Sequence, residues 1–403
     1  MHDESATLKG TGVPLGTADS AAAVQFGRNY RTKKKFVFVV NNDRFFLTHR
    51  ASWATALAAS GGGIIVIAQD TGHSAAIRAL GFQFIPLHFG RESVSVQEAA
   101  KTASKLLLLL LQLRPHGVFL VATAAYSLGW PAALLLPQTR FIRVITGAGR
   151  ALTADSASSG ATGVVRRGLG ISARFPNVHS LFQLESDRDR FVAERLAAAA
   201  RSHVVAGTGI DTNTWTPPET YERPLPVVLF AARLFREKGI YEFIDLARDT
   251  PKGLAKFVVV GKPDTGVNSS VTDEELKAWQ AEKIIEYLGE SDDMLGTYRG
   301  ADIYVLPSTH PEGTPRSLIE AAACGVVAIA SDQPGCRAVV KDGETGLIAR
   351  IEETGSFQAA LERLLNDSDY RQFLSDGARD RAVKEFSLHG TLSRIYPIAG
   401  VEP

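Results

Sequence analysis

One segment of the sequence combines residues that suit a sugar diphosphate with a spacing that would hold them together. It runs from Pro311 to Gly325, reads PEGTPRSLIEAAACG, and comes soon after an apolar run over residues 303–306. A strand, a turn of small residues and a helix form an anion site, because the first helical N–H groups have no partner within the helix and the helix dipole adds partial positive charge. We therefore expect this turn to bind a diphosphate.

Two glutamates flank the turn with seven residues between them. Glu312 is expected in the loop before the helix, and Glu320 in its first turns. Carboxylates accept hydrogen bonds from hydroxyls, so the pair could hold two different sugar rings. Glu320 also has a purely structural interpretation, because Ser317 and Glu320 have the spacing of a capping box that closes the start of a helix.

A second basic pair, Arg233 and Lys238, follows the apolar run 227–230 at the expected start of another helix. Arginine offers a planar fork of donors and lysine a point charge, and both suit a diphosphate leaving group. The alternative is a solvated helix face, which is the usual role of an Arg-Glu-Lys run.

Alternating apolar runs and helical stretches must position these residues. A first series of strands is expected at 36–40, 64–68, 82–85, 118–121 and 141–145, with helices at 73–80 and 96–113. A second series is expected at 227–230, 257–260, 284–287, 303–306 and 327–330. This alternation is typical of parallel sheets covered on both faces. It predicts an α/β protein with two facing Rossmann-like domains and a cleft between the carboxyl ends of their strands.

The 403 residues exceed what one hydrophobic core usually supports, which favours two domains. Residues 1–34 are rich in small and polar residues and are predicted to be a disordered tail. The first domain is expected at 35–215 and the second at 216–385, after Pro217 and Pro218. Residues 386–403 are predicted to form a C-terminal helix that packs back toward the first domain.

The net charge of +1 hides an asymmetry between the two halves. Residues 31–215 hold 21 Lys and Arg against 10 Asp and Glu, whereas residues 216–403 hold 21 against 30. The basic half predicts an anionic partner, such as a membrane surface, a lipid diphosphate or a nucleic acid. Alternatively, the difference serves to hold the two domains together.

The remaining composition describes an ordinary globular protein, with 45% hydrophobic and 22% charged residues. Cys324 and Cys336 are expected to be free thiols in a reducing cytosol. No transmembrane helix is predicted, because the uncharged stretch 117–138 is divided by Gly129 and Pro131.

Taken together, the motifs resemble glycosyltransferase family 4, whose fold is GT-B. They are similar in particular to bacterial enzymes that extend polyprenyl-diphosphate-linked sugars for surface polysaccharides or glycans. The resemblance spans roughly residues 36–390 and rests on these segments: 312–325, 329–337 (IASDQPGCR), 342–347 (DGETGL), 41–50 with FFLTHR, 146–149 (TGAG) and 207–211 (GTGID).

The resemblance implies a retaining, metal-independent hexosyltransferase without a cofactor. Its donor would be a nucleotide-sugar, with UDP expected before GDP. Glu312 and His49 are the implied catalytic residues, with Glu312 on the transferred sugar and His49 facing the reacting sugar or the acceptor. The implied donor-binding residues are Gly313 and Thr314 on the sugar, Glu320 on the ribose, Arg233 and Lys238 on the diphosphate, and Gly147.

The first domain would bind the acceptor, a lipid-linked sugar on polyprenyl diphosphate, and the second the donor. This predicts a cytoplasmic protein of polysaccharide biosynthesis, attached peripherally to the cytoplasmic face of an anionic inner membrane, with no nucleic acid partner. Two departures concern the acceptor half: relatives often carry a lysine where this chain has Ala124, and an Asn-rich turn at 183–186, here QLES.

Other interpretations stay open. Asp187 and Asp189 supply the Asp-x-Asp pattern of a metal-dependent transferase. Gly147 and Gly149 suggest a dinucleotide-dependent oxidoreductase, although Leu152 takes the place of the third glycine. Ala124 fits a catalytically silent homologue that acts as an assembly partner, and a soluble sugar acceptor is an alternative within transferases.

Overall fold

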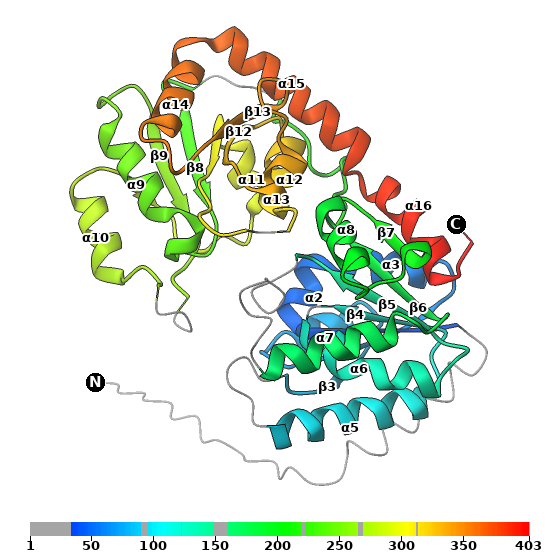
Figure 1. Cartoon of the computed structure of the whole chain (residues 1–403). Helices are drawn as coiled ribbons and strands as arrows, with labels where there is room; N and C mark the ends of the chain where they lie inside the picture. The colour runs from blue at the N-terminus through cyan, green and yellow to red at the C-terminus, as the bar shows by residue number, and fades with distance from the viewer. Residues whose placement is uncertain are drawn as a thin grey trace, which may run out of the picture.

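Two parallel sheets form the framework of the molecule (Figure 1). The computed structural model describes residues 34–89, 96–121, 123–147, 160–219, 223–264, 269–311 and 313–402. In the first sheet seven strands lie in the order β3-β2-β1-β4-β5-β6-β7, and in the second six strands lie in the order β10-β9-β8-β11-β12-β13. The α/β fold with two parallel sheets is therefore confirmed.

The strands and helices of the first sheet's domain have the following bounds: β1 (Lys35–Asn42), α2 (Asp43–His49), α3 (Ala51–Ala59), β2 (Gly63–Gln69), α4 (Ser74–Ala79), β3 (Gln83–Pro86), α5 (Val96–Leu113), β4 (Gly117–Val121), α6 (Thr123–Leu135), β5 (Arg140–Ile145), α7 (Gly160–Ser172), β6 (Val178–Phe182), α8 (Glu185–Ala193), the 3-10 turn η3 (Ala199–Arg201) and β7 (Ser202–Val204).

The elements of the second are β8 (Val227–Ala231), the 3-10 turn η4 (Arg236–Lys238), α9 (Ile240–Asp249), β9 (Lys256–Val260), α10 (Asp273–Ala281), β10 (Glu286–Tyr287), α11 (Met294–Arg299), β11 (Ile303–Leu306), α12 (Arg316–Ala323), β12 (Val327–Ser331), α13 (Pro334–Val339), β13 (Gly346–Ala349), α14 (Ser356–Asn366) and α15 (Ser368–Glu385). A last helix, α16 (Leu388–Ala399), follows them.

The central strands are apolar on both faces because helices cover both faces of each sheet. In β1 the run from Phe36 to Val40 is 0 to 1% exposed, and the strands β4, β11 and β12 are buried throughout. Each sheet separates two hydrophobic clusters, so the core has four layers of packed side chains. The parallel pairing orients all strands of a sheet the same way, which collects the loops that follow them at one edge.

The last helix returns to the first sheet. The backbone of Ile210 exchanges hydrogen bonds with Phe386 and Leu388, at 2.9 and 2.7 Å, and α16 then contacts α3 and β5. Its Ile395 and Ile398 are buried among the side chains that cover this face of the sheet. The first domain therefore receives part of its core from the end of the chain.

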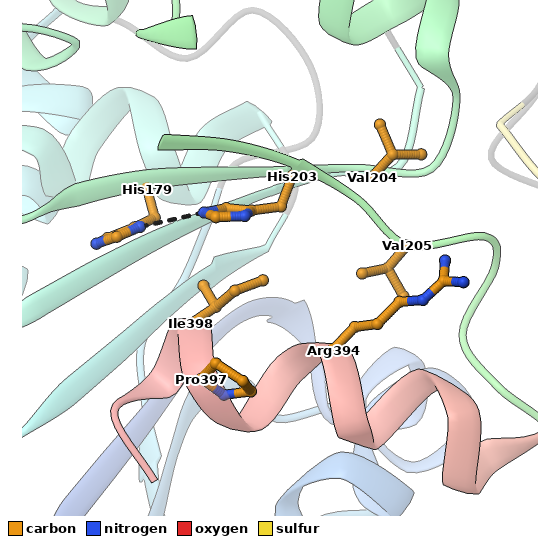
Figure 2. A pocket seen from close by; sticks show the side chains of 7 residues that line it. All are labelled: His179, His203, Val204, Val205, Arg394, Pro397 and Ile398. Atoms are coloured by element: carbon orange, nitrogen blue, oxygen red, sulfur yellow. Dashed lines mark hydrogen bonds between the residues drawn. The ribbon is translucent and has the colours of Figure 1, made fainter. Parts of the chain in front are cut away.

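A cavity of about 380 Å³ lies between α16 and the strands β6 and β7 (Figure 2). His179 of β6 and His203 of β7 face each other there, with Nδ1 and Nε2 3.3 Å apart. Arg394 of α16 also lines the cavity. Burial lowers the pKa of His179 to about 4, with help from His203, Arg140 and Arg201, and burial also lowers the pKa of His203.

Two further predictions concern the cysteines and membrane-spanning helices. Cys324 and Cys336 are free and buried, as predicted. Among the residues described, every helix is too short or too polar to serve as a bilayer span.

Candidate active site

The turn before α12 lies at the edge of the second sheet, where the loop after β11 leads into the helix. The helix begins at Arg316 with Pro315 as its N-cap, and no side chain caps it. Ser317 lies inside the first turn, so the capping-box interpretation of Glu320 is wrong. Glu320 instead accepts a hydrogen bond of 2.7 Å from Nε of Arg316, one turn earlier. Glu312 lies outside the described residues.

Gly313 and Thr314 lie against the first sheet's domain. A Cβ on Gly313 would collide with the carbonyl of Thr146, which follows β5, and would meet Oε1 of Gln183, which follows β6, at 2.8 Å. The N–H of Thr314 donates to the same Oε1 at 3.3 Å. Thr314 is buried, and its hydroxyl has no hydrogen-bond partner among the described residues. The turn thus closes onto the carboxyl edge of the first sheet.

The loop with Arg233 and Lys238 lies beside the one that leads to this turn. Glu237 accepts at its carbonyl from the hydroxyl of Ser308 at 3.0 Å and from the N–H of Thr309 at 3.1 Å. Gly239, at φ +83°, passes so close to the carbonyl of Pro307 that no Cβ would fit. The structure therefore brings the two predicted anion-binding segments together.

Arg233 is exposed at its position after β8. Its side chain is 64% exposed, its Nη1 lies 2.6 Å from Oδ2 of Asp264, and its guanidinium is 4.9 Å from the ring centroid of Phe235. Lys238 ends the 3-10 turn η4. Both residues lie in the loop that follows β8.

His49 ends α2 and lies against α12. Its ring stacks on Phe45 with centroids 4.5 Å apart, and its Nδ1 is 2.6 Å from Oγ1 of Thr48. The guanidinium of Arg316 donates to the carbonyl of Thr48, which links α12 to the end of α2. Burial, with the charges of Arg50 and Arg316, lowers the pKa of His49 to about 3. The imidazole is therefore neutral at physiological pH.

The start of α2 is fixed by two side chains. Asn42 caps the helix by accepting from the N–H of Phe45 at 2.7 Å. The buried carboxylate of Asp43 accepts from the N–H groups of Thr71 and His73 at 2.9 and 2.8 Å, which ties α2 to the loop after β2. Burial opposes the charge of Asp43, but a hydrogen bond from the hydroxyl of Thr71 and these backbone hydrogen bonds outweigh it and lower its pKa to about 2.

Arg50 is a fully buried cation beside this site. Its guanidinium lies 4.4 Å from the ring centroid of Trp53 and donates to the carbonyl of His49 at 2.7 Å. Among the described residues, Nε and Nη2 have no further acceptor. Burial, together with the charge of Arg316, lowers the pKa of Arg50 to about 9.

Glu320 carries the negative charge opposite these cations. Its side chain is 12% exposed, so burial raises its pKa, while Arg316 opposes that shift. A carboxylate that is paired with Arg316 and 12% exposed can accept hydrogen bonds from the hydroxyl groups of a ligand. Gly147 lies one residue beyond Thr146, at the edge that Gly313 meets, and is partly buried.

Three residues of this arrangement were missed in the sequence. Arg316 has a visible signal, since it precedes Glu320 by four residues on a helix, the spacing of an ion pair. Gln183 has none, because its contact with Thr314 depends on how the two domains meet. Arg50 has none either, because its burial against Trp53 and its bond to the carbonyl of His49 follow from tertiary packing. Ala124 lies in the first turn of α6 and is partly buried against the core. Within the described residues, no three His, Cys, Asp or Glu side chains gather as metal ligands, and Asp187 and Asp189 lie on α8.

The second half of the chain matches a known protein family. Residues 213–381 match the model described as "Glycosyl transferases group 1". The chain carries a group 1 glycosyltransferase domain. The family resemblance inferred from the sequence is thereby confirmed.

Curated relatives of this chain match over part of their length. An N,N'-diacetylbacillosaminyl-diphospho-undecaprenol alpha-1,3-N-acetylgalactosaminyltransferase of Campylobacter jejuni is 34% identical over 159 residues, 40% of each chain. An alpha-maltose-1-phosphate synthase of Mycolicibacterium smegmatis is 29% identical over 212 residues, 46% of this chain and 53% of the relative. The matched part thus spans about half the length of these relatives or less.

Solved structures match over nearly the whole chain. The structure of Anabaena Alr3699/HepE in complex with UDP aligns with a TM-score of 0.73 at 16% identity, covering 91% of this chain and 99% of that one. A glycosyltransferase of Rickettsia africae aligns with a TM-score of 0.72 at 15% identity, covering 91% and 98%. The predicted GT-B fold is therefore confirmed.

Proposed function

We propose that this chain is a retaining glycosyltransferase that transfers a hexose from a nucleotide-sugar, with UDP as the nucleotide, to a sugar on polyprenyl diphosphate. The observation that carries the proposal is the meeting of Gly313 and Thr314 with Thr146 and Gln183. It encloses the amino end of α12 between two sheets, next to the loop of Arg233 and Lys238.

In this proposal, the second domain binds the donor. The N–H groups at the start of α12 and the charges of Arg233 and Lys238 bind the diphosphate, and Glu320 accepts the ribose hydroxyls. Glu312 and the amides of Gly313 and Thr314 hold the transferred sugar. As the bond between C1 and the diphosphate oxygen breaks, negative charge grows on the diphosphate. Each hydrogen-bond donor aimed at that charge then lowers the activation barrier by on the order of 3 kcal/mol.

Retention of configuration needs no protein base on the acceptor. The departing phosphate oxygen accepts the proton of the acceptor hydroxyl on the same face of the sugar, while the new C1–O bond forms. His49 suits a positioning contact in this scheme, because its neutral ring can bind a hydroxyl of the sugar or the acceptor without placing a positive charge near the developing oxocarbenium ion. We propose that no metal ion takes part, since Arg233, Lys238 and the helix start supply the positive charge.

The acceptor assignment rests on the Campylobacter jejuni relative, whose name specifies a diphospho-undecaprenol sugar. A lipid-linked acceptor also agrees with the basic character of residues 31–215. We therefore place the enzyme on the cytoplasmic face of an anionic membrane, as a peripheral protein of glycan assembly. A soluble acceptor is the second candidate, because other relatives are named alpha-maltose-1-phosphate synthase and D-inositol 3-phosphate glycosyltransferase.

A thermal-shift panel with UDP, GDP, ADP and dTDP, each with and without EDTA, tests the donor assignment. A nucleotide at 100 times its dissociation constant should stabilise the protein by about 2.7 kcal/mol. We expect UDP to give the largest shift, and EDTA to leave it unchanged. A shift with UDP that disappears in EDTA would refute metal independence, and no shift with any nucleotide would refute the donor site.

Transfer assays then separate the two acceptor classes. Radiolabelled sugar from the selected donor is offered to an undecaprenyl-diphosphate sugar in detergent and, separately, to free monosaccharides and inositol phosphate. Label in the organic phase supports the lipid-linked acceptor. Label in the aqueous sugar fraction alone would move the assignment to a soluble acceptor.

A further inference from the structure

A second cavity lies in the first domain, between α7 and the segment from the end of α8 to η3. Its volume is about 590 Å³, and four arginines line it, namely Arg166, Arg167, Arg174 and Arg195. Glu194 is the one carboxylate in the lining, which leaves a net charge of +3. We call this cavity the arginine groove.

The charge of the arginine groove is poorly neutralised. Arg166 forms an ion pair of 2.8 Å with Glu194, which also binds Arg190 at 3.0 Å, so the single carboxylate is shared. Within the part of the chain that the structure describes, Arg167, Arg174 and Arg195 have no carboxylate within 4 Å. All three are exposed. Three permanently charged guanidinium groups in one groove attract an anionic partner.

The exposed surface of α7 continues the arginine groove with aliphatic side chains. Val164, Arg167 and Ile171 follow a spacing of three and four residues, which places them on one side of the helix. Arg174 extends this line just past the helix end. Val164 is 73% exposed and Ile171 39%. Arginine alternating with exposed aliphatic residues is the composition of surfaces that lie in the headgroup region of a bilayer.

The backbone on the opposite wall holds Arg195 in place. Arg195 has φ +57°, a left-handed conformation that is uncommon for residues other than glycine. Its N–H is bonded to the carbonyl of Val192 at 3.0 Å, which closes the turn after α8. This turn places Arg195 in the lining of the groove, together with Arg167 and Arg174.

From these contacts we infer that the arginine groove binds the phosphate groups of anionic phospholipids and docks the first domain on the membrane. The guanidinium groups match phosphate oxygens in pairs, and Val164 and Ile171 enter the interfacial layer. A nucleic acid fits less well, because none of the described residues lining the groove is aromatic and no base could stack there. This inference deepens the membrane contact of the proposed function and rests on it.

Sedimentation of the full chain with vesicles tests the inference. We expect binding to vesicles that contain phosphatidylglycerol, weakening as salt rises, and little binding to pure phosphatidylcholine. The variant Arg167→Gln/Arg174→Gln/Arg195→Gln should bind the anionic vesicles roughly 100-fold more weakly, at about fivefold per charge. The variant with lysine at the same three positions keeps the charge and should retain most of the binding.

A matched control removes three charges from the other domain. Lys252, Lys277 and Lys283 are exposed there, and their replacement by glutamine should leave vesicle binding near wild type. Equal losses in both triple variants would overturn the assignment to the groove. Wild-type binding in the arginine variant, or equal binding to neutral vesicles, would also overturn it. So would a short oligonucleotide that binds through the same arginines and displaces the vesicles.

The donor site gives an independent readout. The residues that line the groove differ from those that contact the turn at Gly313, so the UDP-induced thermal shift should be the same in wild type and in the arginine variant. If UDP binds and vesicles do not, the membrane inference fails and the donor assignment stands. If vesicles bind and no nucleotide does, the proposed donor site fails alone. A normal UDP shift also shows that the arginine variant is folded.

Discussion

The backbone of Gly313 lies so close to the carbonyl of Thr146 that residue 313 has no room for a side chain. These two residues belong to different domains, so their contact sets how closely the amino end of α12 approaches the first sheet. Oε1 of Gln183 lies on the same side and binds the N–H of Thr314. The proposed donor site is therefore built from both halves of the chain.

Replacing Gly313 by alanine should keep the domains apart. We expect the variant Gly313→Ala to lose activity by about tenfold or more, because a shift of about 1 Å in a reacting group can cost up to 100-fold. The melting temperature should change little, since each domain keeps its own core. Initial rates of UDP release measure the effect. Gly163→Ala is the control, because a Cβ there meets nothing within 4 Å; equal rates in the two variants would contradict the prediction.

Arg233 and Lys238 should act on the diphosphate. The variants Arg233→Ala and Lys238→Ala are each expected to lower turnover by about tenfold or more, since both would lose charge stabilisation of the leaving group. Their folding should be unaffected. Arg236→Ala is the matched control, because Arg236 lies between them in the chain and packs at 4.3 Å over the ring of Tyr241. Wild-type turnover in both test variants would refute the assignment.

Arg316 should determine the pH range in which Glu320 is charged. Burial raises the pKa of Glu320 and Arg316 opposes the rise, so the variant Arg316→Met should raise that pKa further. The acid limb of kcat/KM would then move to higher pH, because the charged carboxylate accepts the ribose hydroxyls. Arg316→Lys keeps a positive charge and should shift the limb less. An acid limb at the same pH in all three proteins would exclude this role.

The paired histidines under α16 should make stability depend on pH. Burial lowers the pKa of His179 from 6.5 to about 4, so the unfolded chain binds a proton that the folded protein does not. The contribution of His179 to the free energy of unfolding is fully present above about pH 6.5 and is lost as the pH drops toward 4. A positive charge on His179 is opposed by the groups around it, which are His203, Arg140, Arg201 and Arg394.

Urea unfolding at several pH values tests this prediction. His179→Gln should flatten the acid decline of the unfolding free energy by about 1 to 2 kcal/mol, a value that allows for partial solvent access. His389→Gln, at an exposed position, should leave the decline as it is. An unchanged slope in His179→Gln would show that other groups cause the acid sensitivity.

The apolar strands were predictable because their sequence pattern is local. Residues 36–40, 118–121 and 303–306 are buried runs, and the structure forms strands there. β6 and β7 were missed because His179, Ser180 and His203 interrupt the apolar pattern. These polar residues are tolerated because the histidines bind each other and Ser180 binds the buried guanidinium of Arg143 at 2.7 Å.

The candidate site was predictable in its parts more than in its assembly. The anion-binding turn and the basic loop follow strands, so their convergence follows from the parallel sheet. Whether Glu320 caps its helix or faces a ligand depended on where α12 begins, and helix ends are poorly determined by sequence. The contact of Gln183 with Thr314 arises only when the two domains meet, and the burial of Arg50 against Trp53 depends on tertiary packing. No local pattern encodes either of them.

The return of α16 to the first sheet has a consequence for how the protein is made. Ile395 and Ile398 complete the core around β1 and β5, yet the ribosome adds them about 190 residues after β7, which is about 10 to 40 s later at ordinary rates of synthesis. The second domain can fold in that interval. The first domain must wait for α16, so nascent chains should expose its unfinished apolar face to chaperones until α16 has left the ribosome.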